Sequence, residues 1–144
     1  MSTVTIDDHL LRDVLVGDTP GQLEKLLRRN GLATTNLFYH RLCRAGLGSR
    51  GGALTGPWSP AERERAVRAL LELPDDIEIL PMQDLAPRMA ELARDYRLST
   101  LSAEAIVAAE VWNGPLCVWE RDAGPNTRAC CEAVGVRYQL IGRV

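Results

Sequence analysis

Short apolar runs alternate with longer amphipathic stretches along this 144-residue sequence. The runs are bounded by turn residues and predict buried strands at about residues 4–7, 77–80, 116–119 and 136–141. Between them, apolar residues recur every three or four positions, which predicts helices at about residues 8–16, 20–29, 35–45, 60–72, 83–97, 102–112 and 127–134. This alternation predicts a single α/β domain over residues 1–144, with a parallel sheet of about four to five strands flanked by helices.

Helix starts and turns punctuate this pattern. Ser59 is a predicted N-cap followed by a proline and an acid in the first turn, and Thr34 or Thr35 and Ser102 are predicted to cap two further helices. Residues 46–60 are rich in glycine. No predicted strand precedes them and no P-loop lysine follows, so we expect a flexible connection rather than a phosphate-binding loop.

Acidic residues follow two of the predicted strands directly. Asp7 and Asp8 end the first strand, and Glu120 and Asp122 follow the strand at residues 116–119. Right-handed crossovers place the carboxyl ends of parallel strands at one edge of the sheet, where open α/β sheets bind ligands. The helix predicted to begin at Ser102 points its amino end at the same edge.

Composition narrows the class of protein. Hydrophobic residues make up 46% of the chain, which is enough for one core, and the net charge of −2 gives no overall attraction to nucleic acid or membrane. The four cysteines contain no CxxC spacing, and we expect them to be reduced. No apolar run approaches the roughly 18 residues of a membrane span. We therefore expect a cytoplasmic protein without membrane contact.

Three stretches resemble the PIN domain, the nuclease fold of VapC-type toxins. Residues 7–15 are similar to the family's opening motif, in which an acid ends the first strand and a second acid follows six residues later. Residues 98–105 resemble the segment that leads into the family's alanine-rich helix. Residues 116–122, with the helix and strand behind them, resemble its carboxyl-terminal part. The likeness covers essentially the whole chain.

This resemblance implies metal-dependent hydrolysis of RNA, in which a cluster of carboxylates holds Mg²⁺ or Mn²⁺ and the metal activates a water molecule. The implied catalytic residues are Asp7, Glu104 and Asp122. The implied metal ligands are Asp7, Asp122 and Asp8.

Two positions depart from the family pattern. Its second acid is usually a glutamate on the helix that begins here near Thr35, where this chain carries Tyr39, His40 and Arg41. Its third acid is usually an aspartate at the position of Ser102, with Glu104 two residues further on.

A basic residue at the second-acid position changes the expected electrostatics. Two like charges about 4 Å apart repel by about 4 kcal/mol at an effective dielectric constant of 20, so Arg41 or His40 would oppose metal binding. Either side chain would instead be able to pair with Asp7 or Asp122. The same helix face and the neighbouring helix start supply the predicted substrate contacts: His40, Arg41, Arg44 and Ser102.

Structural roles remain open for the same residues. Asp7, Asp8 and Glu104 lie where acids favour helix starts, and Asp122 lies in a loop where a solvated carboxylate is ordinary. Ser102 has no His/Asp pair arranged around it and suits a cap better than a nucleophile. The two histidines lack a ligand spacing, and the three tryptophans are too scattered in sequence to suggest a base-stacking platform.

Three functional hypotheses follow. The first is a VapC-like ribonuclease that acts on RNA as a homodimer with a cognate antitoxin, and it predicts a divalent metal between Asp7 and Asp122. The second is a non-catalytic PIN-like module that binds RNA or a protein partner, and it predicts an ion pair between Arg41 or His40 and Asp7. The third is an α/β domain that binds a small molecule or phosphate at the same edge.

Overall fold

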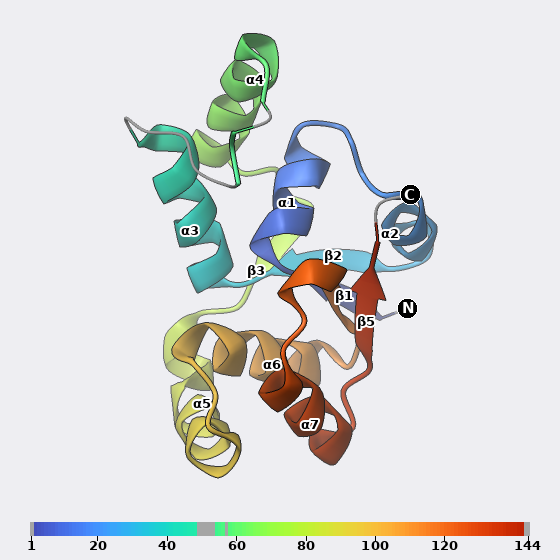
Figure 1. The fold of residues 1–144 in the computed structure, drawn as a ribbon, viewed down its shortest axis with the longest axis vertical. Coiled ribbons are helices and arrows are strands. Elements are labelled where there is room, and N and C mark those ends of the chain that lie inside the picture. Colours follow the sequence, from blue (N-terminus) through green and yellow to red (C-terminus); the bar gives the residue numbers. More distant parts are fainter. Residues whose placement is uncertain (1, 49–53, 57, 143–144) are drawn as a thin grey trace.

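Five parallel strands form the centre of the part of the chain that this computed structural model describes, residues 2–48, 54–56 and 58–142 (Figure 1). They are β1 (Thr3–Ile6), β2 (Gly31–Thr34), β3 (Ile77–Ile79), β4 (Leu116–Trp119) and β5 (Tyr138–Ile141). Their order in the sheet is β3-β2-β1-β4-β5, and every neighbouring pair is parallel. The predicted α/β fold with a parallel central sheet is confirmed.

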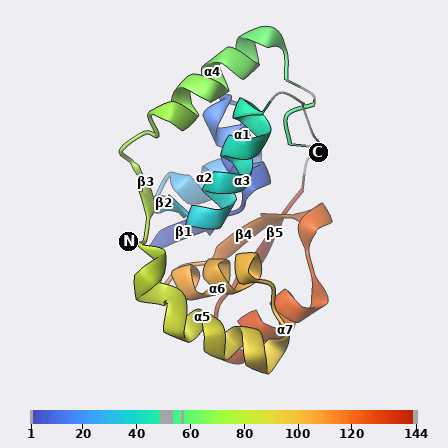
Figure 2. The same ribbon diagram turned by 90° about the vertical axis from the view of Figure 1, so that its left-hand side faces the viewer.

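Helices cover both faces of this sheet (Figure 2). They are α1 (Asp8–Leu15), α2 (Gly21–Leu27), α3 (Asn36–Leu47), α4 (Pro60–Leu71), α5 (Met82–Tyr96), α6 (Thr100–Trp112) and α7 (Pro125–Val134), with a short 3₁₀ helix, η1 (Glu120–Asp122), after β4. One core joins buried residues of α1 to α4 to the sheet, and the other joins α5, α6 and α7 to its opposite face. Alternate residues of β4 divide between the two cores, as the two-residue period of a strand requires: Cys117 faces the first, and Leu116 and Val118 face the second.

The strand β2 is missing from the elements that the sequence pattern predicts. Only four residues long, it begins directly after Asn30, and the Asn-Gly pair there suggested a turn. The strand is nonetheless internal to the sheet, because Leu32 pairs with Val4 of β1 on one side and with Ile77 of β3 on the other. Four residues are too few to show a clear hydrophobic period, so only pairing on both sides identifies this strand.

Two helix starts differ from the predicted ones. Ser99 rather than Ser102 caps α6, and its side chain accepts a hydrogen bond from the backbone N–H of Ser102. Helix α7 begins at Pro125 behind Gly124, rather than at the predicted caps Asn126 or Thr127. At Ser59, by contrast, the predicted cap of α4 is confirmed as a complete capping box with Glu62.

The glycine-rich stretch predicted at residues 46–60 lies partly outside the described residues, which omit 49–53 and 57. Leu54 and Thr55, which are described, are buried. The guanidinium of Arg12 in α1 donates to the carbonyl oxygen of Leu54 at 3.4 Å. No helix in the described ranges has the length and apolar character that crossing a membrane requires.

Candidate functional site

Asp7 lies at the carboxyl end of β1, at the edge of the sheet where the sequence predicts the site. Asp7 follows β1 with extended backbone and serves as the N-cap of α1. Its Oδ1 accepts a hydrogen bond from the backbone N–H of Leu10 at 2.9 Å, and its Oδ2 accepts one from the backbone N–H of Trp119 at 3.1 Å. Both oxygens are therefore bonded, and the carboxylate joins the start of α1 to the end of β4. Asp7 thus has the helix-capping role that the sequence allowed as an alternative to a functional one. The residue also lies at the same edge of the sheet as the other acids.

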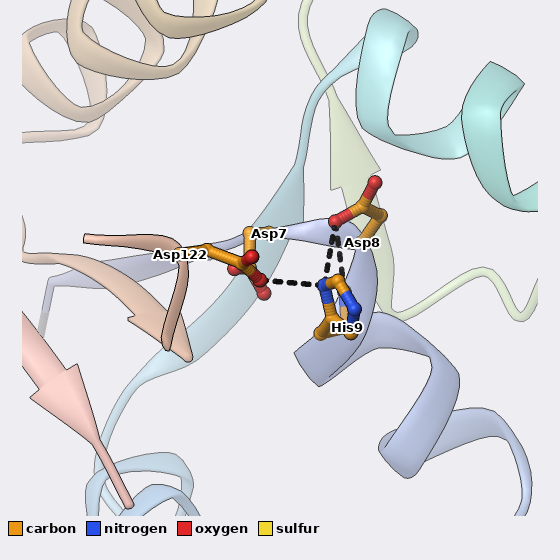
Figure 3. A group of neighbouring side chains, drawn as sticks. All are labelled: Asp7, Asp8, His9 and Asp122. Atoms are coloured by element: carbon orange, nitrogen blue, oxygen red, sulfur yellow. Dashed lines mark hydrogen bonds and ion pairs between the residues drawn. The ribbon is translucent and has the colours of Figure 1, made fainter. Parts of the chain in front are cut away.

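Three further side chains gather beside Asp7 (Figure 3). His9 Nδ1 lies 2.6 Å from Asp122 Oδ2 and 3.3 Å from Asp8 Oδ1. One potential ligand atom from each of Asp7, Asp8, His9 and Asp122 lies within 4.8 Å of the others. Two segments supply these residues, the β1–α1 junction and η1. The parallel pairing of β1 with β4 brings these segments together.

Burial perturbs the protonation equilibria of this group. Asp7 is only 2% exposed, and burial, with the charge of Asp8 adding to it, raises the pKa of Asp7 to about 7 against the pull of its two amide hydrogen bonds. For His9, burial alone would lower the pKa. The close contact of its Nδ1 with the Asp8 carboxylate and the charges of Asp122, Asp8 and Asp7 outweigh that effect and raise the pKa of His9. Asp7 and His9 therefore hold more protons near neutral pH than isolated side chains of the same kind would.

Arg41, on α3, extends its guanidinium toward the Asp8 carboxylate of this cluster. Its Nη1 lies 3.3 Å from Asp8 Oδ2, although the two atoms lack hydrogen-bond geometry. The prediction that Arg41 or His40 pairs with Asp7 or Asp122 is therefore wrong: Arg41 lies at ion-pair distance from Asp8 instead. The Arg41 side chain is 51% exposed, so solvent screens the interaction and its net worth is about 0–1 kcal/mol. His40 and Arg44, also predicted to contact substrate, are exposed on α3.

Glu104 is directed elsewhere. It is fully buried in α6, where Oε2 accepts hydrogen bonds from the backbone N–H of Asn36 at 3.0 Å and from its side-chain Nδ2 at 2.7 Å. Oε1 accepts one from the backbone N–H of Leu37 at 2.9 Å. These amides form the first turn of α3, so the Glu104 carboxylate satisfies the free donors of a helix 67 to 68 residues away in sequence. It does not join the group formed by Asp7, Asp8, His9 and Asp122.

A cavity of about 180 Å³ opens above the acids. Asp7, Asp8 and Asp122 border it together with Arg41 and Ser102, and apolar residues such as Phe38 and Val118 complete its walls. Ser102 reaches it from the first turn of α6, while its Oγ also lies 3.2 Å from the Oγ of Ser99. Of the predicted site residues, Asp7, Asp8, Asp122, Arg41 and Ser102 thus meet at one cavity.

Two residues at this edge were not predicted by sequence reasoning. His9 was set aside because the second histidine, His40, has no ligand spacing from it; its position directly behind two strand-terminal acids was the signal available. Trp119 ends β4, and its ring stacks on that of His9 with centroids 5.0 Å apart and an interplanar angle of 22°. Its aromatic contacts depend on tertiary packing and leave no trace in the sequence pattern.

The donor set is compatible with a divalent cation. Three carboxylates supply the hard oxygen ligands that Mg²⁺ and Mn²⁺ prefer, and an imidazole nitrogen favours Mn²⁺ over Mg²⁺. Asp8 Oδ2 and His9 Nδ1 are buried and make no hydrogen bond of good geometry among the described residues, although each lies at ion-pair distance from a partner. Asp8 Oδ2 can therefore accept a further ligand as it stands, whereas His9 Nδ1 can bind a metal once it has lost its proton.

Comparison with known proteins supports the fold. No protein-family model and no curated protein matches the sequence. Among solved structures, the chain is similar to the crystal structure of PAE2754 from Pyrobaculum aerophilum, with a TM-score of 0.55 and 15% sequence identity over 96% of this chain and 83% of that one. At this identity the match concerns the arrangement of the backbone alone.

Proposed function

We propose that this chain is a PIN-like ribonuclease of the VapC toxin type, which uses a divalent metal to hydrolyse a phosphodiester bond of RNA. The observation that carries the proposal is the convergence of Asp7, Asp8, His9 and Asp122 at the carboxyl edge of the sheet, beneath a cavity with a cationic rim. An acidic floor suits a metal ion, and the guanidinium at the rim suits a phosphate oxygen.

Each residue has a distinct part in this proposal. Asp8, His9 and Asp122 would hold Mn²⁺ or Mg²⁺ together with Asp7, whose bonds to the amides of Leu10 and Trp119 fix its orientation. When bound, the metal would supply a water molecule of lowered pKa and stabilise developing negative charge. Arg41 would leave its weak contact with Asp8 and bind an oxygen of the phosphate. Apolar walls would exclude bulk water and so strengthen these charge interactions.

Calorimetric titration with Mn²⁺ tests the proposal first. We expect a binding isotherm at neutral pH and, at 100 times the dissociation constant, a stabilisation of about 2.7 kcal/mol that raises the melting temperature by several degrees. Asp122→Asn should weaken both effects. Asp76→Asn serves as the matched control, because Asp76 is an exposed carboxylate in the loop before β3. In Mn²⁺, the wild type and Asp76→Asn should cleave a labelled single-stranded RNA at similar rates, and Asp122→Asn should cleave it more slowly. The absence of Mn²⁺ binding in the wild type would exclude the mechanism.

A second candidate is a non-catalytic PIN-like module that binds RNA or a protein partner. The contacts of His9 with Asp122 and of Arg41 with Asp8 favour it, because they partly neutralise the acids without a metal. This module would bind RNA equally well in EDTA and in Mn²⁺ and would leave it intact.

Assembly belongs to the same proposal. A VapC-type toxin would form a homodimer, act in the cytoplasm and pair with a cognate antitoxin. Light scattering on the purified chain tests the dimer directly, because a mass of 15.9 kDa would indicate a monomer.

A further inference from the structure

Three side chains form a stack next to the acidic cluster, called here the aromatic column: His9, Trp119 and Arg121. The Trp119 ring stacks on His9, and the guanidinium carbon of Arg121 lies over the same ring, 5.2 Å from its centroid. Trp119 is partly buried at the end of β4, whereas Arg121 is exposed on η1. His9 and Asp122 belong to the cluster, so the column begins at the proposed metal site and ends in solvent.

Arg121 is held in place weakly. Within the described residues its guanidinium contacts the Trp119 ring and makes no hydrogen bond or ion pair. When the cation is exposed to solvent, as Arg121 is, its contact with an aromatic ring contributes about as little free energy as a surface ion pair. A flat ligand can therefore take the place of the guanidinium on the ring at small cost, and the displaced cation remains close enough to interact with that ligand.

A second covered ring borders the cavity. Tyr138 lines the cavity above the acids, and Arg128 of α7 lies over its ring, with the guanidinium carbon 5.8 Å from the centroid. The Tyr138 hydroxyl accepts a hydrogen bond from the backbone N–H of Gly124 at 3.4 Å, which anchors the ring to the loop behind η1. Exposed arginines over aromatic rings thus recur on the β4–β5 side of the site. Cations combined with aromatic faces are the groups that bind an unpaired strand of nucleic acid.

We propose that Trp119 is a base-stacking residue, which holds the unpaired base next to the phosphate bound by Arg41 at the cavity, with Arg121 closing over or beside that base. This inference rests on the proposed function and adds to it a positioning residue. A base inside a duplex has both faces covered by its neighbours, so the surface discriminates in favour of unpaired nucleotides. Every base has a π-face, so the contact gives little preference among the four bases.

Binding in EDTA tests the stacking without any cleavage. The probes are a fluorescein-labelled octa-adenylate RNA, the same oligonucleotide with one abasic nucleotide at each position in turn, and the blunt-ended duplex of the octamer. We expect intact single strands to bind best, and one abasic position to bind about 5- to 150-fold more weakly, as expected for one lost stack. Trp119→Leu should weaken binding of the intact octamer by a similar factor and should leave the affinity for that abasic octamer unchanged.

Tryptophan fluorescence gives a second readout that does not depend on truncating the side chain. RNA should quench the wild type and the matched control Trp112→Phe, while Trp119→Phe should lose the quenched component and keep its affinity within a few-fold. If Trp119→Leu fails to fold, the abasic series and Trp119→Phe still decide. Equal wild-type affinity for all abasic octamers, or full quenching in Trp119→Phe, would overturn the inference. Quenching without hydrolysis in Mn²⁺ would support stacking and refute only the nuclease, whereas hydrolysis without quenching would refute only stacking.

Discussion

Substituting Asp7 by asparagine should change how the stability of the fold depends on pH. Burial raises the pKa of Asp7 from 3.8 to about 7. The folded state therefore binds this proton more tightly than the unfolded chain does. The contribution of this proton to the unfolding free energy is fully present below about pH 4 and is lost as the pH rises through 7. A shift of about three pKa units corresponds to ~4 kcal/mol between these limits. The raised pKa of His9 acts in the same direction at pH values above 6.5.

Urea denaturation in EDTA at pH 5, 6 and 7 measures this dependence. From Asp7 alone, the unfolding free energy of the wild type should fall by up to ~1.4 kcal/mol per pH unit over this range. Asp7→Asn should remove that component. Asparagine can still accept from the N–H of Leu10, but its amide nitrogen would face the N–H of Trp119, so a constant loss of ~1–3 kcal/mol should accompany the flatter profile. The slope, rather than the offset, is the diagnostic quantity.

Asp76→Asn provides the matched control, because it removes an exposed carboxylate and should run parallel to the wild type. If the unfolding free energies of Asp7→Asn and the wild type change in parallel between pH 5 and 7, burial does not destabilise the ionised form of Asp7, and the explanation is refuted. Saturating Mn²⁺ should also flatten the wild-type profile, since a bound cation favours the ionised carboxylate.

Further substitutions test the packing and the charge around the site. Glu104→Gln should lower the unfolding free energy by ~2–4 kcal/mol in urea denaturation, because it leaves donors of α3 unpaired, whereas Glu110→Gln, which loses only a half-exposed ion pair, should cost less than ~1 kcal/mol. Gly114→Ala should prevent native folding as seen by circular dichroism, because its Cβ would lie 2.0 Å from a backbone oxygen of β1, while Gly21→Ala meets nothing within 4 Å and should be neutral or slightly stabilising. Arg41→Gln should tighten Mn²⁺ binding severalfold in calorimetry, since it removes a positive charge beside Asp8; weaker binding would show that Arg41 organises the acids instead.

The acidic edge was predictable from sequence because it depends on local patterns and one topological rule. Strand-terminal acids can be recognised at Asp7 and Asp122, and parallel strands with right-handed crossovers bring such positions to one edge. The contact between His9 and Asp122 follows no such rule. It requires η1 to lie beside the start of α1, where the Trp119 ring also stacks on His9.

Glu104 marks a different limit of sequence reasoning. An acid in the first turns of a helix suggests interaction with that helix's own amino end, and the family resemblance suggests a metal ligand. The structure instead turns the side chain toward Asn36 and Leu37, because α6 packs beside the start of α3. A contact across 67 or 68 residues depends on the relative placement of two helices, and neither segment carries a local signal of it.

The acids of the cluster differ in their partners: Asp7 bonds to backbone amides, whereas Asp8 and Asp122 lie near basic side chains. Asp7 has both oxygens bonded to backbone amides, so it is rigid, and burial together with the charge of Asp8 opposes its ionisation. Asp8 instead lies near Arg41 and His9, and Asp122 lies near His9. In the proposed site Arg41 would leave Asp8, and His9 would lose its Nδ1 proton in order to bind the cation. Metal affinity should consequently depend on how readily Arg41 leaves and His9 loses its proton. In the proposed metal site, Arg41 would therefore tune the affinity for the cation, while the acids that would bind it are all present.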